Sequence, residues 1–255
     1  MNNDKPPAVR EKAPPKVRRV YKSVEVGIRD GGTFAVLLDG KPALTPLRAP
    51  LAAASRALAA AVAAEWDAQD PHIDPEAMPL TRLLATALDK VSPQRAAVID
   101  SLLSYVDADT ICFRALHPAD LRARQQKLWQ PVMDWLQREH DIALAAVDGL
   151  MPAAQSPKAV ARLRRALEDL GNAELTAFQA AASLANSLAL AFALIRRHMS
   201  AADVFAAAFL DELYQVERWG EDQLVQDRRR RIAGDLAAIE RYLALSASSE
   251  VAASG

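Results

Sequence analysis

The sequence predicts an α+β protein, in which a small N-terminal domain of antiparallel β-sheet plus helices precedes a helical C-terminal domain. Three observations support this class. Apolar and polar residues alternate between residues 20 and 45, as they do in half-buried strands. Alanine, which favours helices, is abundant, whereas aromatic residues make up only 5% of the chain. After residue 109 the regular patterns are helical, so we place the boundary near residues 107–120.

The strand pattern is clearest in two segments. Apolar side chains occupy alternate positions in residues 20–28 and again in residues 34–38. The dipeptide Asp39-Gly40 that follows is a favourable two-residue hairpin turn. We therefore expect an antiparallel meander whose third, short strand covers residues 41–45.

Helices are expected where apolar residues recur at helical spacing between prolines, glycines and capping residues. In chain order they cover residues 51–66, 79–90, 93–105, 118–129, 157–170 and 176–195, then a helix that carries residues 211–222 and a final helix to about residue 245. Pro131 is expected to break or kink the helix that Pro118 opens, because proline removes a helical donor. Ser200 and Asp203 form a capping pair for the helix with the acidic stretch. Residues 142–150 stay ambiguous.

Composition limits the possible classes of function. The formal net charge of −1 argues against general nucleic-acid binding, which needs a basic surface. Cys112 is the single cysteine, so an intrachain disulfide is impossible and a reducing compartment is expected. Residues 1–18 lack the apolar segment of a signal peptide and are rich in proline, so we expect a disordered tail there and another at 247–255. The cytoplasm of a bacterium is the simplest location.

Residues 176–195 need a separate test for membrane insertion. They carry no charge and are just long enough to span a bilayer. However, Gln179, Ser183 and Asn186 fall on one face of the expected helix, and most of the apolar residues are alanine. A buried helix with a polar stripe is therefore favoured, and no membrane insertion is expected.

The sequence contains no pattern typical of catalysis or metal binding. His72, His117, His140 and His198 are widely spaced and form neither an i,i+4 pair nor a Glu-x-x-His motif. A phosphate-binding loop and a Gly-x-Ser-x-Gly elbow are also absent from the sequence. Cys112 has no adjacent histidine, so we expect a buried structural thiol. We predict no metal site, no cofactor and no catalytic residue.

The acidic and aromatic stretch at residues 211–222 is the most unusual part of the sequence. In a single helix, Glu217 would share one stripe with Leu210, Leu213 and Leu224. A carboxylate on an apolar stripe loses hydration and needs a partner. That partner is expected to be either an arginine of this chain or a group on another protein.

Three roles for Glu217 stay open at this point. It could form an internal ion pair with an arginine such as Arg82 or Arg114, contact a partner protein, or act as the general acid or base of a helical-bundle enzyme. No nucleophile or cofactor motif accompanies it, and Glu212 diverges from it around the helix. Trp219 lies beside Glu212 on the flank of this helix, where tryptophan is a common interface anchor. A binding protein is therefore favoured over an enzyme.

Several blocks of sequence, taken in order, carry a family resemblance. They are Arg19–Lys22, Leu38–Pro42 with Thr45-Pro46, Val62–Gln69, Met78–Leu83, Thr86–Asp89, a set of Tyr105, Asp107, Asp109, Cys112 and Arg114, a set of Gln126, Trp129, Pro131 and Trp135, and Glu212 with Tyr214–Asp222. Together they resemble the ATP synthase assembly chaperones of the Atp-twelve type, found in mitochondria and alphaproteobacteria. Ala85 departs from the asparagine usual in that family, and Ala108 from a frequent threonine. The resemblance covers residues 19–245.

The resemblance implies a function, a fold and a site. The chain would bind the newly made alpha subunit of the ATP synthase catalytic head (the F-one sector) and shield its beta-contacting surface until the hexamer forms, without a nucleotide or other cofactor. The fold would be an α+β domain at residues 19–115 and an orthogonal helical bundle at residues 116–246. The partner-binding residues would be Glu217 first, then Glu212, Gln215 and Trp219. We expect a monomer in the bacterial cytoplasm, with eukaryotic relatives in the mitochondrial matrix.

Overall fold

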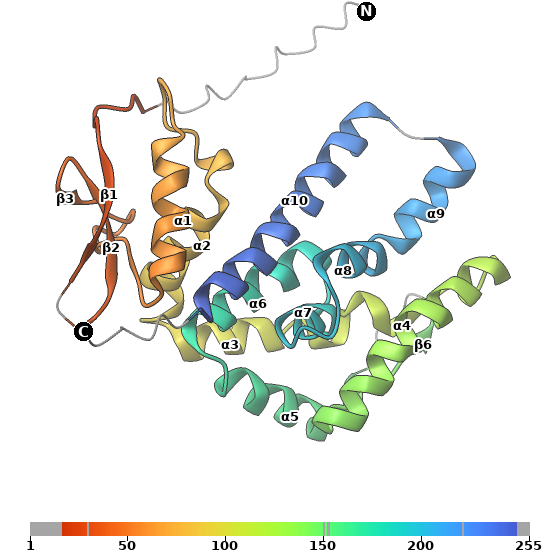
Figure 1. The fold of residues 1–255 in the computed structure, drawn as a ribbon. Coiled ribbons are helices and arrows are strands. Elements are labelled where there is room, and N and C mark those ends of the chain that lie inside the picture. The colour runs from red at the N-terminus through yellow and green to blue at the C-terminus, as the bar shows by residue number, and fades with distance from the viewer. Residues whose placement is uncertain (1–16, 30, 150, 152–153, 221, 249–255) are drawn as a thin grey trace, which may run out of the picture.

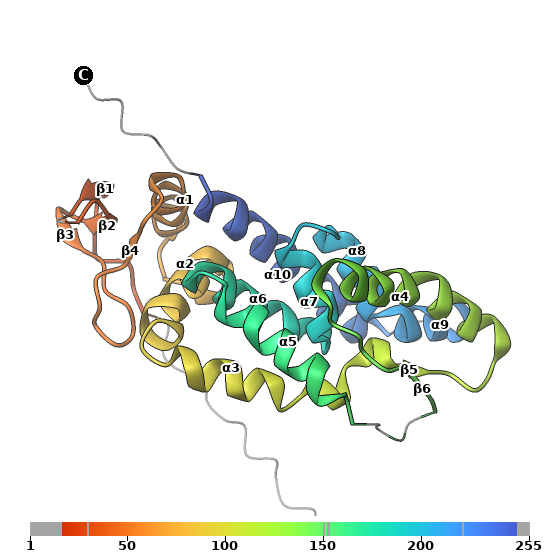
Figure 2. The same ribbon diagram turned by 90° about the horizontal axis from the view of Figure 1, so that it is seen from below.

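A computed structural model of the chain describes residues 17–29, 31–149, 151, 154–220 and 222–248. Most of the two expected tails, at residues 1–16 and 249–255, lies outside these described residues. The described part confirms the α+β class. A small antiparallel sheet lies at one end of the molecule, α1 and α2 lie next to it, and the other helices extend beyond them (Figures 1 and 2).

The N-terminal sheet is built around β2 (Phe34–Leu38). Strand β1 (Val24–Ile28) pairs with it in antiparallel register, and β3 (Lys41–Pro42) returns after the tight turn at Asp39 and Gly40. Both turn residues have positive φ, 48° and 76°, as a two-residue hairpin of this kind requires. The third strand is shorter than expected. A fourth strand, β4 (Ala52–Ala53), pairs with β2 where the sequence suggested a helix.

Helix α1 (Arg56–Asp67) begins five residues later than the expected start at residue 51. The reason is local: Leu51 still donates and accepts sheet-like hydrogen bonds, to Ala43 and from Val36. Ser55 then caps the helix, its hydroxyl accepting a hydrogen bond from the Leu58 amide. The apolar face of α1 packs against β1 and β2.

The next helices follow the expected order with shifted ends. Helix α2 (Pro79–Thr86) begins at its proline as expected, and a π-helical turn, Ala87–Val91, extends it. Helix α3 (Arg95–Leu103) starts two residues later than expected, because the Ser92 amide still completes the π-helical turn by donating to Ala87.

Helix α4 (Ala119–His140) is continuous over 22 residues, so of the break or kink expected at Pro131 the break is wrong. Proline in a helix leaves the carbonyl four residues earlier without its usual donor. That carbonyl belongs to Lys127, which is exposed, so water can replace the missing donor. The ambiguous segment after α4 contains β6 (Val147–Asp148), which pairs in parallel with β5 (Phe113–Arg114).

Helix α5 (Pro157–Glu168) is capped by Ser156, and the uncharged segment after it forms two helices where one was expected. These are α6 (Asn172–Ala185) and α7 (Leu188–Ile195). Asn186 between them has a φ of 48°, a conformation that asparagine tolerates better than most residues, and Ser187 caps α7. Every residue of α7 is buried. Among the described residues, no helix is long and apolar enough to cross a membrane.

The last part of the described chain forms α8 (Ala201–Ala208), α9 (Leu210–Trp219) and α10 (Gln223–Ser246). The capping pair of Ser200 and Asp203 is confirmed, but it opens α8 and not the helix with the acidic stretch. Gly220, with a φ of 80°, ends α9, so α9 and α10 are separate helices that meet end to end, and we call the two together the α9–α10 arm (Figure 1).

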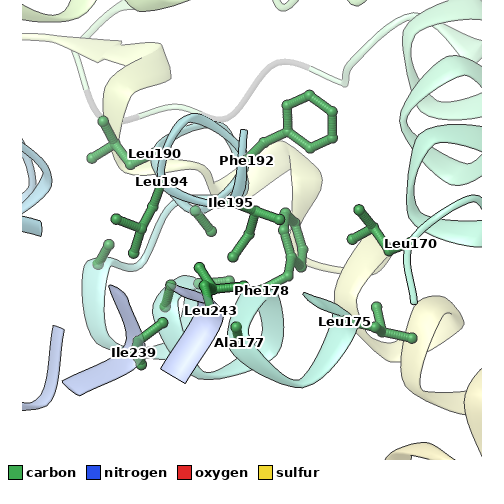
Figure 3. Close-up of a cluster of buried hydrophobic side chains, with 14 of the residues drawn as sticks. Leu170, Leu175, Ala177, Phe178, Leu190, Phe192, Leu194, Ile195, Ile239 and Leu243 are labelled. Carbon is green, nitrogen blue, oxygen red and sulfur yellow. The ribbon is translucent and has the colours of Figure 1, made fainter. Parts of the chain in front are cut away.

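The described buried hydrophobic residues form a cluster that runs from Val36 in the sheet to Leu243 in α10. Its centre lies where α6, α7 and α10 meet, with Phe178, Phe192 and Ile239 among its members (Figure 3). Helix α10 packs against α1 and α2 as well as α6, α7 and α8. Residues from both expected domains share this cluster, and the division into 19–115 and 116–246 stays a prediction.

A buried carboxylate, that of Asp109, joins two segments distant in sequence. One of its oxygens accepts from the Ile111 amide at 3.2 Å, and the other accepts from the Ala189 amide in the first turn of α7 at 2.9 Å. Complete burial raises the pKa of Asp109, although these hydrogen bonds oppose the rise. The nearby Cys112 is buried as expected, and burial raises the pKa of its thiol to about 12.

We expect Asp109→Ala to lower the free energy of unfolding by about 2 kcal/mol or more, because it removes a helix cap and leaves two buried amides without acceptors. Asp109→Asn keeps one acceptor oxygen and should cost less. Chemical unfolding of both variants at neutral pH measures the difference. An alanine variant as stable as the asparagine variant would contradict this role.

Candidate binding surface

Helix α9, which carries the predicted site residues, is held against α4 by polar contacts centred on Tyr214. The Tyr214 hydroxyl donates to Asp120 Oδ1 at 2.8 Å, and Arg218 reaches Asp120 Oδ2 at 2.5 Å. The guanidinium groups of Arg218 and Arg124 lie 4.4 and 5.2 Å from the centre of the Tyr214 ring. The sequence pattern gives no sign of this contact, because Asp120 and Arg124 of α4 lie more than 80 residues before Tyr214 in the chain.

The charges of this contact shift two pKa values. Burial and the hydrogen bond to Asp120 raise the pKa of the Tyr214 hydroxyl. The hydrogen bond from Tyr214 and the Arg218 guanidinium hold the pKa of Asp120 below its ordinary value. At neutral pH the contact therefore consists of the ionised Asp120 carboxylate between the Tyr214 phenol and the Arg218 guanidinium.

Glu217 is part of the same α4–α9 contact, and it is exposed. Arg124 Nη1 contacts both of its carboxylate oxygens, at 2.9 and 2.7 Å, and this contact raises the pKa of Arg124. The expected position on a buried apolar stripe is therefore wrong. The expected internal ion pair with an arginine is present, but neither example was the right one: Arg82 pairs with Asp235 at 2.9 Å, and Arg114 is buried beside Ile111.

The other three predicted residues face away from Glu217. Residues 212, 215 and 219 follow one another at helical spacing, so they share one face of α9, while position 217 points to the opposite side. Glu212 lies 3.8 Å from Arg228 of α10, and Gln215 is exposed. The structure thus groups Glu212, Gln215 and Trp219 and places Glu217 with α4.

The end of the α9–α10 arm presents large apolar side chains to solvent. Trp219 is 76% exposed, and Leu224 and Val225, just beyond the turn, are 77% and 40% exposed. We call these three residues the apolar tip. In a single helix over residues 211–224, Leu224 would share the stripe of Glu217. The positive φ of Gly220 separates the two helices and exposes Leu224. Exposed apolar groups of this size often mark interaction sites.

The surroundings of Glu217 differ from those of a catalytic acid. Its carboxylate is exposed and engaged by a guanidinium, so it lacks the desolvated pocket that would adapt a carboxylate to general acid–base catalysis. Among the described residues, no group of three or more histidine, cysteine, aspartate and glutamate side chains could hold a metal ion.

Comparison with known proteins gives a consistent result. The family model for the ATP12 chaperone protein matches residues 18–137. The crystal structure of Atp12 from Paracoccus denitrificans is 36% identical in sequence, covers 90% of this chain and 98% of its own, and superposes with a TM-score of 0.83. The chain belongs to the ATP12 chaperone family. A second crystal structure, of a chaperone candidate from Agrobacterium tumefaciens, is also 36% identical, with 89% and 85% covered and a TM-score of 0.84.

Membership in the ATP12 family settles the class of function. The chain is an ATP synthase assembly chaperone and not an enzyme. The family model covers the N-terminal sheet and most of α4, and the solved ATP12 structure extends the similarity over most of the chain. The family resemblance in the sequence is therefore confirmed. The roles of Glu217, Glu212, Gln215 and Trp219 in this ATP12 chaperone stay predictions.

We expect Tyr214→Phe to lower the melting temperature at pH 7 by roughly 2–4 °C, because Asp120 loses its buried donor. The lowered pKa of Asp120 gives stability that is present above its unfolded value of 3.8 and is lost as the pH falls through the folded value. The difference between wild type and variant should therefore shrink below pH 3.8. Thermal unfolding across pH checks this, and an unchanged difference at acid pH would contradict it.

Proposed function

We propose that this ATP12 family chaperone binds the unassembled alpha subunit of the ATP synthase catalytic head. It shields the alpha-subunit surface that later meets the beta subunit, and it is displaced as the hexamer forms. The observation that carries this proposal is the apolar tip on the α9–α10 arm, next to the face with Glu212 and Gln215. We further propose that the chaperone acts as a monomer in the bacterial cytoplasm.

A subunit that normally lies between two neighbours exposes apolar interface area before assembly, and such area aggregates unless it is covered. A tryptophan exposed at the end of an arm offers a large contact area at a low entropic cost, and tryptophan is enriched among residues that dominate binding energy. The acidic and amide side chains of Glu212 and Gln215 fit the polar rim that surrounds such anchors.

Glu217 has a different part in this proposal. Since Arg124 engages both of its oxygens, Glu217 holds α9 against α4 and so orients the apolar tip. The alternative within the same function is a direct contact between Glu217 and a basic residue of the client. The charge-swap experiment below separates the two.

We expect Trp219→Ala to weaken binding of the alpha subunit at least tenfold, because truncating a central anchor commonly costs more than 1.4 kcal/mol, or about a factor of ten. Pull-down of the alpha subunit from native extract, followed by titration with purified subunit, measures the effect. The matched control is Ile28→Ala in β1, an apolar side chain that is 79% exposed at the other end of the molecule. If wild type captures no alpha subunit, or if the two variants bind equally well, the proposal is wrong.

We expect Glu217→Lys to abolish protection of the alpha subunit against aggregation, because a lysine would face Arg124 and release α9. The pair exchange Glu217→Arg with Arg124→Glu restores the ion pair with reversed charges. If Glu217 acts through α9, the exchange recovers most of the protection. Failure of the exchange in a protein with wild-type thermal stability would instead show a direct client contact. Light scattering of unassembled alpha subunit is the measurement, and full protection by Glu217→Lys would refute both roles.

A further inference from the structure

An apolar cavity next to the N-terminal sheet has no place in the function described so far. It has a volume of about 800 Å³ and lies between α2 and the loop that joins β3 to β4. On the α2 side, Met78, Ala85 and Asp89 follow one another at helical spacing. The loop side includes Leu44 and Leu47. The lining is mostly apolar, and we call this cavity the α2 groove.

Hydrogen bonds to Asp89 hold the loop in place beside α2. The Thr45 hydroxyl donates to Asp89 Oδ1 at 2.6 Å, and the Leu47 amide donates to Asp89 Oδ2 at 3.0 Å. The side chains of Leu44 and Leu47 are nevertheless 47% and 71% exposed. The groove is therefore preformed, and the apolar side chains at its rim stay in water unless another segment covers them.

The described chain begins beside this groove. Ile73 lines the groove, and its amide donates to the Val17 carbonyl at 2.8 Å. The Arg19 amide donates to the Pro71 carbonyl at 3.0 Å, so the two segments run antiparallel. Two more residues in that direction lead from Ile73 to Pro75, which also lines the groove. The 16 residues before Val17, which we call the N-terminal tail, therefore join the described chain at the groove.

The N-terminal tail has the composition of a segment that binds grooves. Its four prolines form two pairs, at residues 6–7 and 14–15, with two alanines and a valine between the pairs. Proline pairs favour the extended polyproline II helix, which has no internal hydrogen bonds and binds apolar grooves lined by aromatic rings at a low entropic cost. Trp66, which is half-buried, supplies an aromatic ring to the α2 groove.

The charge of the tail matches the surface where it joins the described chain. The tail carries four basic residues and two acidic ones. Asp70, Asp74 and Glu76 lie close to the junction in sequence and are exposed, and they outnumber Arg18, a basic residue exposed in the same segment pair. Opposite charges of this kind favour contact between the tail and this side of the molecule.

We propose that the α2 groove binds the N-terminal tail of its own chain through residues 8–15, held as an extended polyproline II segment. From Met78 to Asp89 the α2 side of the groove is about 16 Å long, since a helix rises about 1.5 Å per residue. Eight residues of polyproline II cover about 25 Å, which is enough to follow that side from the junction at Val17.

The covalent attachment of the tail makes weak contacts sufficient. A short tether gives the tail a roughly millimolar effective concentration at the groove, so a segment with little affinity of its own still occupies it. The bound tail covers the exposed rim of Leu44 and Leu47 in the free chaperone. The proposal makes no assumption about the client and does not rest on the proposed function.

Photocrosslinking tests where the tail lies. Benzoylphenylalanine is placed in the full chain at Val9 or at Leu47, and the matched control carries it at Leu116, which is 59% exposed and does not line the groove. We expect Val9 adducts confined to residues that line the groove, Leu47 adducts within residues 8–15 of the same chain, and no tail adducts from Leu116. Val9 adducts scattered over the surface, or no tail adducts from Leu47, overturn the proposal.

Two other occupants give different products. A mixture of chains of two isotopic masses distinguishes crosslinks within one chain from crosslinks between two copies, and crosslinks only between copies assign the groove to a second copy. Leu47 adducts on purified alpha subunit, with none on the tail whether or not the subunit is present, assign the groove to the client. Either result overturns the proposal, whereas tail adducts in the free chaperone support it even if the alpha subunit later displaces the tail.

Proteolysis tests the apolar rim. Trypsin cleaves after Arg10 and Lys12, and a tail bound in the groove protects both bonds. The double variant Leu44→Gln with Leu47→Gln keeps side-chain size but makes the rim polar. We expect it to be cleaved at these two bonds about tenfold faster than wild type, which corresponds to a loss of about 1.4 kcal/mol in binding of the tail.

The matched control for proteolysis is Ile28→Gln with Leu116→Gln, which changes two exposed apolar side chains outside the groove. It should keep the wild-type cleavage rate. All four substituted side chains are exposed, so both double variants should keep the wild-type melting temperature. Equal cleavage rates in wild type and the groove variant, or equal acceleration in the control, overturn the proposal.

Discussion

The bundle depends on one constraint: α7 is buried along its whole length, so the amides of its first turn need acceptors inside the protein. The Ser187 hydroxyl accepts from the Leu190 amide, and the Asp109 carboxylate accepts from the Ala189 amide. Because Asp109 comes from a segment 80 residues earlier, this cap also fixes the turns around residues 106–112 against the bundle. The backbone at the break between α6 and α7 is fixed to the same segment, because the Thr110 amide donates a hydrogen bond to the Asn186 carbonyl.

From that centre the structure extends to the surface that we assign to the client. Helix α10 leaves the core beside α6 and meets α9 at the apolar tip, and α9 returns along α4 through the Tyr214 and Glu217 contacts.

Particular residues show how far sequence patterns reached. The turn at Asp39 and Gly40 and the capping pair of Ser200 and Asp203 depend on neighbouring residues only, and both were predicted correctly, although the pair opens α8 and not the helix with the acidic stretch. The break expected at Pro131 was wrong, and the carbonyl that this proline leaves without a donor belongs to Lys127, which is exposed to water. The acidic stretch was correctly chosen as unusual, but the partner of Glu217 could not be found, since spacing along one helix says nothing about which helix packs against it.

The sequence by itself determined the α+β class, the order of the elements, the buried character of residues 176–195 and the ATP12 family, because local periodicity, capping and ordered sequence blocks carry that information. Only the tertiary structure decided that Glu217 pairs with Arg124 and that Trp219 and Leu224 are exposed. Each of these facts joins residues far apart in the chain or depends on one left-handed glycine. Such contacts are set by how helices pack, which no local pattern specifies.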